Sequence, residues 1–206
     1  ALTAGEDVGV IASDNPFDGA FSSPGDGFQE YQRGVSGSIP FALADDSAGS
    51  FEADTLGIVG TTDTAPFFGV VDTVNGDTTG PVSASITFDI AGASAPSLFL
   101  DVAAMGDFEA DDDVTVSVSV DGGAETVLFE LIADEDGEQA YALEGGAEVV
   151  LNDPMTLSGV TLTNAFQTFS AAVGEAGSEL TVTITAETDG GSEAIAFRNL
   201  RVLDVT

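Results

Sequence analysis

Carboxylates dominate the polar chemistry that this chain can perform. Thirty-six Asp and Glu residues stand against three basic residues, and His, Cys and Lys are absent. Carboxylate oxygens can bind hard cations such as Ca²⁺, or work in pairs as a general acid and base. Without His, Cys or Lys, the chain lacks the common nucleophile–base pairs, thiolate metal sites, Schiff-base chemistry and the P-loop lysine. The residue types therefore favour cation binding over catalysis.

The densest group of acids has the sequence Asp-Phe-Glu-Ala-Asp-Asp-Asp. In an extended chain alternate residues share one face, so its first, third, fifth and seventh residues would lie together. Close carboxylates repel one another unless a proton or a cation neutralises them, and Ca²⁺ takes about six to eight oxygen ligands. We expect a Ca²⁺ site here, and the alternative is a solvated loop on a very acidic surface. The predicted ligands are Asp107, Glu109, Asp111, Asp112 and Asp113.

Two further groups of acids have spacings that fit an irregular Ca²⁺ loop and fit an Asx-rich turn at least as well. The predicted ligands in these groups are Asp45 and Asp46, close to Asp54, and Asp72 and Asp77, close to Asn75. A further candidate group near the N-terminus comprises Glu6, Asp7, Asp14 and Asp18.

Residues 134–138, Asp-Glu-Asp-Gly-Glu, begin like an EF-hand loop but fail its pattern. Gln139 stands where the loop requires an invariant Gly, and Gly145 stands where it requires a bidentate Glu. We expect a β-turn there.

Aromatic residues that could form sugar-binding platforms are scarce. The chain has no Trp, and its Tyr residues are Tyr31 and Tyr141. A carboxylate pair could in principle hydrolyse a glycosidic bond, yet the parts of an active site are mostly missing. We expect a protein that is not an enzyme, with a carboxylate-based glycoside hydrolase as the remote alternative. Carbohydrate binding through Ca²⁺ would not depend on such platforms.

The few positive charges are Arg33, Arg198 and Arg201. Arg198 and Arg201 are three residues apart in a predicted strand, so we expect them on opposite faces, each paired with surface carboxylates. The net charge of −33 repels nucleic acid and anionic membranes. No run of about 18 apolar residues could form a spanning helix. The sequence therefore predicts neither a nucleic-acid partner nor membrane insertion.

Alternating apolar and polar residues predict short β-strands along most of the chain, separated by turns rich in Gly, Asp and Pro. Residues 12–30 are expected to form a loop. The predicted strands are residues 36–43, 55–59, 67–72, 83–90, 97–102, 114–120, 126–132, 157–169, 180–186 and 194–205. We predict an all-β protein, a jelly-roll β-sandwich of about ten antiparallel strands. Residues 1–206 would form a single domain, with residues 1–34 as an N-terminal strand or loop extension.

A series of segments carries a resemblance to a known type of module. They are residues 38–47, 54–59, 67–75, 87–92, 105–109, 120–123, 189–194 and 196–202. Together they resemble the jelly-roll modules of large secreted bacterial proteins, which accompany extracellular nuclease, lamin-tail-like or calcium-binding repeat regions. The last segment, Ala-Phe-Arg-Asn-Leu-Arg-Val, also resembles the closing strand of galactose-binding-like and carbohydrate-binding jelly rolls. The resemblance covers about residues 35–206 and implies a place for a structural Ca²⁺ beside Glu193 and Asn199. It implies no nuclease activity.

Three functions remain open from the sequence. The first is a non-catalytic extracellular structural or adhesive module, stabilised by Ca²⁺ and able to assemble with itself as a surface-layer or filament subunit. The second is a carbohydrate-binding module of a secreted protein, with an extracellular glycan as its partner. The third is the remote glycoside hydrolase. The acidity and the absence of Lys favour a location outside the cell or on its surface, although the same acidity also suits solvation in high salt.

Overall fold

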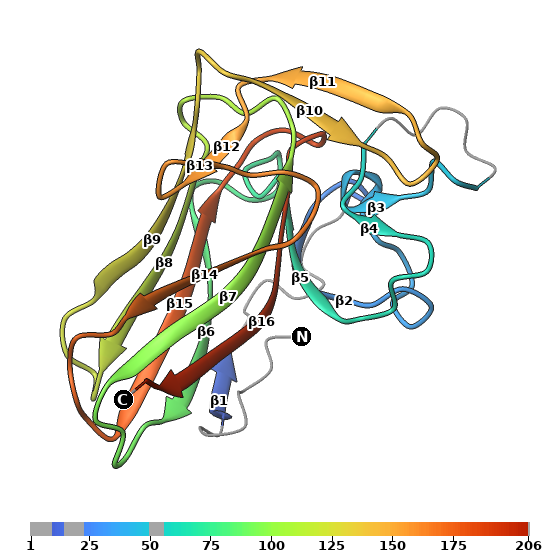
Figure 1. Ribbon diagram of the computed structural model, residues 1–206. Helices are drawn as coiled ribbons and strands as arrows, with labels where there is room; N and C mark the ends of the chain where they lie inside the picture. Colours follow the sequence, from blue (N-terminus) through green and yellow to red (C-terminus); the bar gives the residue numbers. More distant parts are fainter. Residues whose placement is uncertain (1–9, 15–22, 50–55, 206) are drawn as a thin grey trace.

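Strands with alternating side chains build two facing sheets, in a computed structural model that describes residues 10–14, 23–49 and 56–205 (Figure 1). The first sheet has seven strands in the order β1-β6-β15-β8-β9-β12-β13, and the second has five in the order β14-β7-β16-β5-β2. Every pairing within these two sheets is antiparallel. The predicted all-β jelly-roll sandwich is confirmed.

The strand bounds are as follows. The seven-stranded sheet contains β1 (Val10–Asp14), β6 (Val82–Asp89), β15 (Glu179–Glu187), β8 (Asp113–Val120), β9 (Thr126–Ala133), β12 (Met155–Leu157) and β13 (Val160–Thr161). The five-stranded sheet contains β14 (Gln167–Ala172), β7 (Pro96–Met105), β16 (Ala194–Asp204), β5 (Phe67–Val71) and β2 (Gly27–Tyr31). Two small sheets add the parallel pair β3 (Ala44–Asp45) and β4 (Val59–Gly60), and the hairpin of β10 (Glu138–Ala142) and β11 (Glu148–Asn152).

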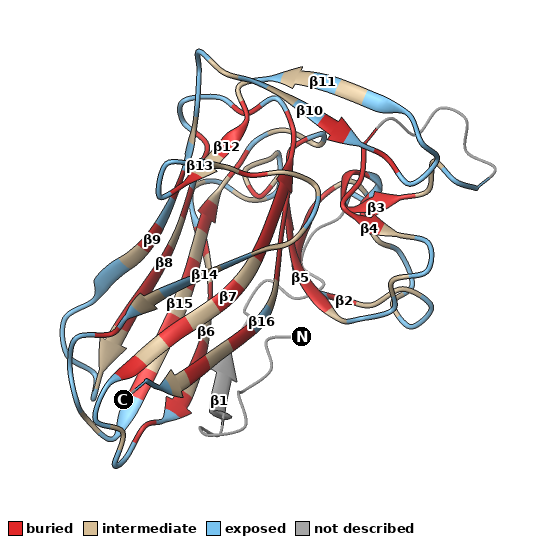
Figure 2. Cartoon of the chain, viewed as in Figure 1, coloured by how far each residue is buried: buried red, intermediate tan, exposed pale blue. Residues whose placement is uncertain are grey.

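Two apolar cores hold these layers together (Figure 2). The larger core lies between the two main sheets, where inward-facing residues alternate with polar ones, as in the buried–intermediate pattern of β6 and β15. The smaller core joins β5 and the start of β16 to the 3₁₀ turn η1 (Phe41–Leu43), β4 and β10. Tyr141 of β10 is fully buried there. Part of the outer face of the five-stranded sheet is therefore covered.

Three predicted segments differ from the structure for local reasons, and one hairpin lies outside the prediction. Residues 36–43 do not form a strand, because Leu43 N–H donates to the Pro40 carbonyl (3.0 Å) and closes the turn η1. Residues 157–169 break into separate short strands where Ser158 and Gly159 adopt positive φ angles of 53° and 76°. Within the predicted loop 12–30, β2 pairs with β5. The hairpin β10–β11 was not predicted, because its alternation is weak.

In the described part of the chain, no helix has the length and apolar composition that a membrane crossing requires.

Candidate metal centre

Two chain crossings meet at one end of the sandwich. Residues 106–112 lead from β7 in the five-stranded sheet to β8 in the seven-stranded sheet. Residues 188–193 lead back from β15 to β16, which again joins the two sheets. Antiparallel pairing aligns both crossings, because Glu187 lies opposite Asp113 and Ala194 lies opposite Met105. The two loops are therefore neighbours, although about eighty residues separate them along the chain.

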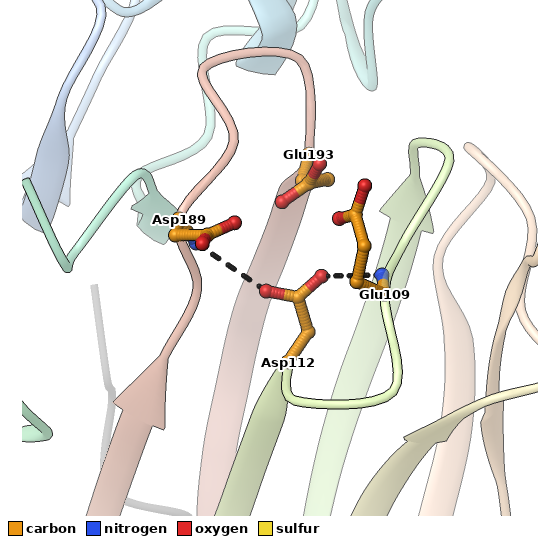
Figure 3. Close-up of side chains that lie close together, drawn as sticks. All are labelled: Glu109, Asp112, Asp189 and Glu193. Atoms are coloured by element: carbon orange, nitrogen blue, oxygen red, sulfur yellow. Dashed lines mark hydrogen bonds between the residues drawn. The ribbon is translucent and has the colours of Figure 1, made fainter.

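Four carboxylates from these loops converge (Figure 3). Glu109 and Asp112 come from the first loop, and Asp189 and Glu193 come from the second. One carboxylate oxygen from each residue lies within 4.8 Å of the others. Two oxygens bound to the same Ca²⁺ at about 2.4 Å lie at most about 4.8 Å apart, so this spacing is compatible with a single ion. The group could hold a metal ion.

Asp112 contacts both loops and is buried, with 4% of its surface exposed. Its Oδ2 accepts a hydrogen bond from the Glu109 backbone N–H (2.8 Å), and its Oδ1 accepts one from the Asp189 backbone N–H (3.3 Å). These two bonds, drawn as dashed lines in Figure 3, tie one loop to the other. Asp112 thus orients both loops and still presents its carboxylate to the group.

Glu193 is the most unusual member of the group. Its side chain is buried, with 6% exposed, and its Oε2 has no hydrogen-bond partner among the described residues. Figure 3 shows this carboxylate above Asp112, with Asp189 on one side and Glu109 on the other. A Cβ at Gly190 would lie 1.9 Å from Glu193 Oε1, so the backbone approaches this carboxylate more closely than any side chain would allow. A buried carboxylate oxygen without a partner destabilises the fold unless a proton or cation compensates it.

The pKa values of Glu193 and Asp112 reflect the same unfavourable burial of carboxylates. Burial, followed by the negative charges of Asp112 and Glu109 and a side-chain hydrogen bond with Glu109, raises the pKa of Glu193 to about 9, against a backbone hydrogen bond from Gly190 that lowers it. Burial also raises the pKa of Asp112 to about 6, against two backbone hydrogen bonds that lower it. Without a cation, Glu193 therefore keeps a proton at neutral pH, and a bound cation would replace that proton.

A second acidic pair lies beside the four carboxylates. Burial raises the pKa of Asp72 to about 6, helped by its hydrogen bond with Asp26 and by the charges of Asp26 and Asp189. Asp72 adopts a positive φ of 47°, and the Asn75 side chain donates both to the Asp72 carbonyl (2.9 Å) and to Asp26 Oδ2 (3.2 Å). Asp72 and Asp26 extend the acidic region around Asp189.

The acidic run at residues 107–113 is arranged differently from the expected extended strand. Asp112 N–H donates to the Glu109 carbonyl (3.0 Å), which closes a turn and brings residues three apart together. Of the five predicted ligands in this run, Glu109 and Asp112 join the group. Asp107 and Asp111 are exposed outside it, and Asp113 opens β8. The expectation of one shared extended face is wrong, because the chain turns here to change sheets.

Asp45 and Asp46 hold the small parallel sheet in place. Asp45 is buried and accepts hydrogen bonds from the Ser47 N–H (3.1 Å) and hydroxyl and from the Glu144 N–H (2.7 Å). Asp46 forms an ion pair with Arg33 at 2.8 Å. Protein donors occupy both oxygens of Asp45, Asp46 is paired with Arg33, and neither residue belongs to the group of four.

Asp77 lies in a turn of the Asx type. The Asn75 Oδ1 accepts hydrogen bonds from the Asp77 N–H (2.9 Å) and the Thr78 N–H (3.1 Å). Residues 134–137 form the expected β-turn, with the Gly137 N–H donating to the Asp134 carbonyl (2.8 Å). The N-terminal candidates Glu6, Asp7 and Asp18 lie outside the described residues, as does the Asp14 side chain. Asp54 also lies outside them.

Reasoning from the sequence missed the partnership between the two loops. Residues 189–191, Asp-Gly-Gly, are a turn signal in the sequence, and the resemblance implies a Ca²⁺ position at Glu193, but neither observation connects this loop to Glu109 and Asp112. Asn199, implied with Glu193, binds Asp101 instead (2.7 Å). The register of β15 against β8 and of β16 against β7 would have revealed the contact.

The outer face of β16 carries a second polar surface. Asn199 adopts a positive φ of 54° and forms a bulge, so Arg198 pairs with Asp101 and Arg201 pairs with Phe99. Asp101 and Phe99 are two residues apart on β7 and share a face, so the two arginines do too. The expectation that they face opposite sides is therefore wrong. Arg198 forms an ion pair with Asp63 (2.8 Å).

No protein-family model matches the chain, and no curated protein matches its sequence. Similar solved structures include the carbohydrate-binding module TmCBM61 in complex with β-1,4-galactotriose, at 9% identity and a TM-score of 0.38, covering 92% of this chain and 94% of that one. The K3 cleaved adhesin domain of Lys-gingipain from Porphyromonas gingivalis W83 matches at 9% identity and a TM-score of 0.40, covering 94% and 98%. A family 16 carbohydrate-binding module matches at 8% identity and 0.35, covering 70% and 80%. These likenesses are too distant to carry an argument about function.

Proposed function

We propose that this chain is a non-catalytic extracellular β-sandwich module, stabilised by one Ca²⁺ ion bound to Glu109, Asp112, Asp189 and Glu193. The buried carboxylate of Glu193, whose Oε2 has no hydrogen-bond partner among the described residues, carries the proposal, since a cation at this position would satisfy it. Four protein carboxylates suit Ca²⁺ better than Mg²⁺, which keeps most of its water ligands and rarely occupies an all-protein cage.

The ion would link the two sheets. Its four ligands come from the two loops that cross the end of the sandwich, so binding would oppose separation of the sheets at that end. A ligand that binds the native state and not the unfolded state raises the free energy of unfolding. The rise is about 2.7 kcal/mol when the ligand concentration is a hundred times the dissociation constant. A structural, adhesive or scaffolding role outside the cell, where millimolar Ca²⁺ is available, is consistent with this chemistry and with the net charge of −33.

Thermal unfolding of paired variants tests the proposal. We expect CaCl₂ to raise the melting temperature of the wild type well above the value in NaCl or MgCl₂ of equal ionic strength. Glu193→Gln should lose the Ca²⁺-specific part of this rise. Glu130→Gln, which removes one exposed carboxylate on β9, should keep it. An equal response of the wild type to Ca²⁺ and to Na⁺ would contradict the metal centre.

Carbohydrate binding is a second candidate, favoured by the outer face of the five-stranded sheet. There the Arg201 guanidinium lies 5.3 Å from the centre of the Phe99 ring. Beside it, Asp101 accepts hydrogen bonds from the Thr168 hydroxyl (2.6 Å) and the Asn199 amide (2.7 Å). An aromatic ring, a guanidinium and an oriented carboxylate are groups that can bind sugar rings and hydroxyls.

The charge of this face indicates a neutral glycan. Arg198 and Arg201 offset Asp63 and Asp101 locally, while the whole chain repels polyanions. Affinity electrophoresis in gels that contain neutral polysaccharides tests the idea. Retardation of the protein would support the idea if Phe99→Ala abolishes it. Val127→Ala, at an exposed position on β9, should preserve it. Unchanged mobility in every gel would remove this candidate.

A further inference from the structure

β14 is an outer strand of the five-stranded sheet (Figure 1). It pairs with β7 along its whole length, from Gln167 opposite Val102 to Ala172 opposite Ser97. Among the described strands, none pairs with its other side. Such an edge presents a row of backbone groups that another strand can use.

The alternation of hydrogen-bonded pairs between β14 and β7 shows which backbone groups of β14 point away from β7. The Val173 N–H donates to the Pro96 carbonyl (2.9 Å), so residues 173 and 96 form a bonded pair of the antiparallel ladder. Bonded pairs alternate along such a ladder, so Gln167, Phe169 and Ala171 bond to β7. The N–H and C=O groups of the alternate residues point away from β7. These residues are Thr168, Ser170 and Ala172, whose side chains are exposed.

This edge lacks the protection that natural sheets usually carry. Edge strands are normally guarded by charged residues, Pro or a bulge. Residues 155–174 contain neither charge nor Pro, and 154–174 is the longest uncharged stretch of a chain with a net charge of −33. No register shift occurs between β14 and β7. Phe169 and Ala171, which face the main core, are only partly buried. A further strand would cover them.

We propose that β14 is a self-association surface, on which a second copy of the chain adds its own β14 in antiparallel orientation. The acidic charge of each copy opposes contact over most of the surface, and this neutral edge is where two copies can approach. A two-fold axis at Ser170 would place Thr168 opposite Ala172 of the partner subunit and Phe169 opposite Ala171 of the partner subunit. The backbone N–H and C=O groups of Thr168, Ser170 and Ala172 would then form hydrogen bonds across the interface.

The association is weak and depends on salt. One strand pair of six residues covers less than the roughly 1,200–2,000 Å² that stable interfaces bury. Self-repulsion between two highly negative copies falls as salt shortens the Debye length to about 3 Å at 1 M. Dimerisation should therefore increase with protein concentration and with NaCl, whichever cation fills the metal centre.

Sedimentation velocity with paired substitutions tests this surface. The protein is kept in saturating CaCl₂ and about 1 M NaCl, at concentrations up to about 1 mM, the range for a weak complex. We expect the wild type to dimerise and Ser170→Glu, which places like charges opposite each other, to stay monomeric. Ser97→Glu is the matched control, because Ser97 lies one strand inward, opposite Ala172. This variant should dimerise like the wild type.

Ser170→Pro provides a second arm. It removes an outward N–H and leaves the ladder to β7 complete, so it should abolish the dimer without a large change in melting temperature. The melting temperature of each variant establishes that it is folded. A wild type that stays monomeric throughout would overturn the proposal, as would equal loss of the dimer in Ser170→Glu and Ser97→Glu. The Ca²⁺ response of the monomer is measured separately, so either proposal can fail alone.

Discussion

Glu193 illustrates how one residue can couple folding to both protons and cations. Its carboxylate is buried, directed at two other acids, and held there because Gly190 leaves no side chain in its way. In the absence of a cation, burial favours the protonated, neutral form of this carboxylate, and its pKa therefore rises to about 9. A cation and a proton therefore compete for this carboxylate.

The proton on Glu193 predicts how stability depends on pH when the centre holds no cation. The folded protein keeps this proton up to about pH 9, whereas the unfolded chain loses it near the ordinary value of 4.5. The folded state therefore binds more protons between these values, so the free energy of unfolding should decline as pH rises from about 5 to 9. Urea unfolding in chelator across this range measures the decline. Glu193→Gln should flatten it above about pH 6, where the raised pKa values of Asp112 and Asp72 no longer contribute.

Binding of Ca²⁺ should release a proton for the same reason. At pH 7 we expect close to one proton per ion, mainly from Glu193, with a smaller share from Asp112. Calorimetric titrations in two buffers of different ionisation enthalpy count the protons released. Equal heats in both buffers would show that Glu193 is already ionised and would contradict its assigned role.

At the scale of elements, single side chains decide how the small sheets attach to the sandwich. Arg33 follows β2, and its guanidinium donates through Nε (2.9 Å) and Nη2 (2.7 Å) to the Val59 carbonyl of β4. Its Nη1 donates to Asp46 Oδ1 (2.8 Å), just after β3. A planar fork is needed to reach both partners at once, and the ammonium of Lys cannot reproduce it.

Arg33→Lys should therefore destabilise the protein although it preserves the charge. We expect the free energy of unfolding to fall by about 2 kcal/mol, since hydrogen bonds to charged groups contribute about 1.5–3 kcal/mol. Urea unfolding measures the change. Arg201→Lys, at a more exposed position on β16, should change stability by less than about 0.5 kcal/mol. Equal effects of the two substitutions would show that the fork of Arg33 contributes nothing specific.

At the scale of the whole molecule, net charge and site occupancy act on stability in different ways. A charge of −33 on one compact chain repels itself, which lowers the stability of the folded state. Salt screens this repulsion, because the Debye length falls from about 30 Å at 0.01 M to about 8 Å at 0.15 M. Screening depends on ionic strength and not on one carboxylate.

NaCl should therefore raise the melting temperature in chelator, and Glu193→Gln should show the same rise as the wild type. Differential scanning calorimetry across this range of NaCl measures both. If the variant lost its NaCl response together with its Ca²⁺ response, the group of four carboxylates would be the main source of the self-repulsion. A melting temperature independent of NaCl would show that self-repulsion is negligible.

Local sequence patterns are enough to predict the fold class and the kinds of chemistry that the side chains can perform. Strict alternation in β6, β8 and β15 predicts half-buried strands, because successive side chains of a strand point to opposite faces. The absence of His, Cys and Lys leaves carboxylates as the reactive groups. Both conclusions follow from local periodicity and composition, so they needed no knowledge of distant contacts.

Which carboxylates meet depends on long-range strand pairing. Glu109 and Asp112 approach Asp189 and Glu193 because both loops cross between the sheets at the same end, and strand register sets that arrangement. The bulge at Asn199 likewise places Arg198 and Arg201 on one face, against the simple alternation of a strand. Register and bulges depend on how separate strands pair, and a single strand carries little information about its partner.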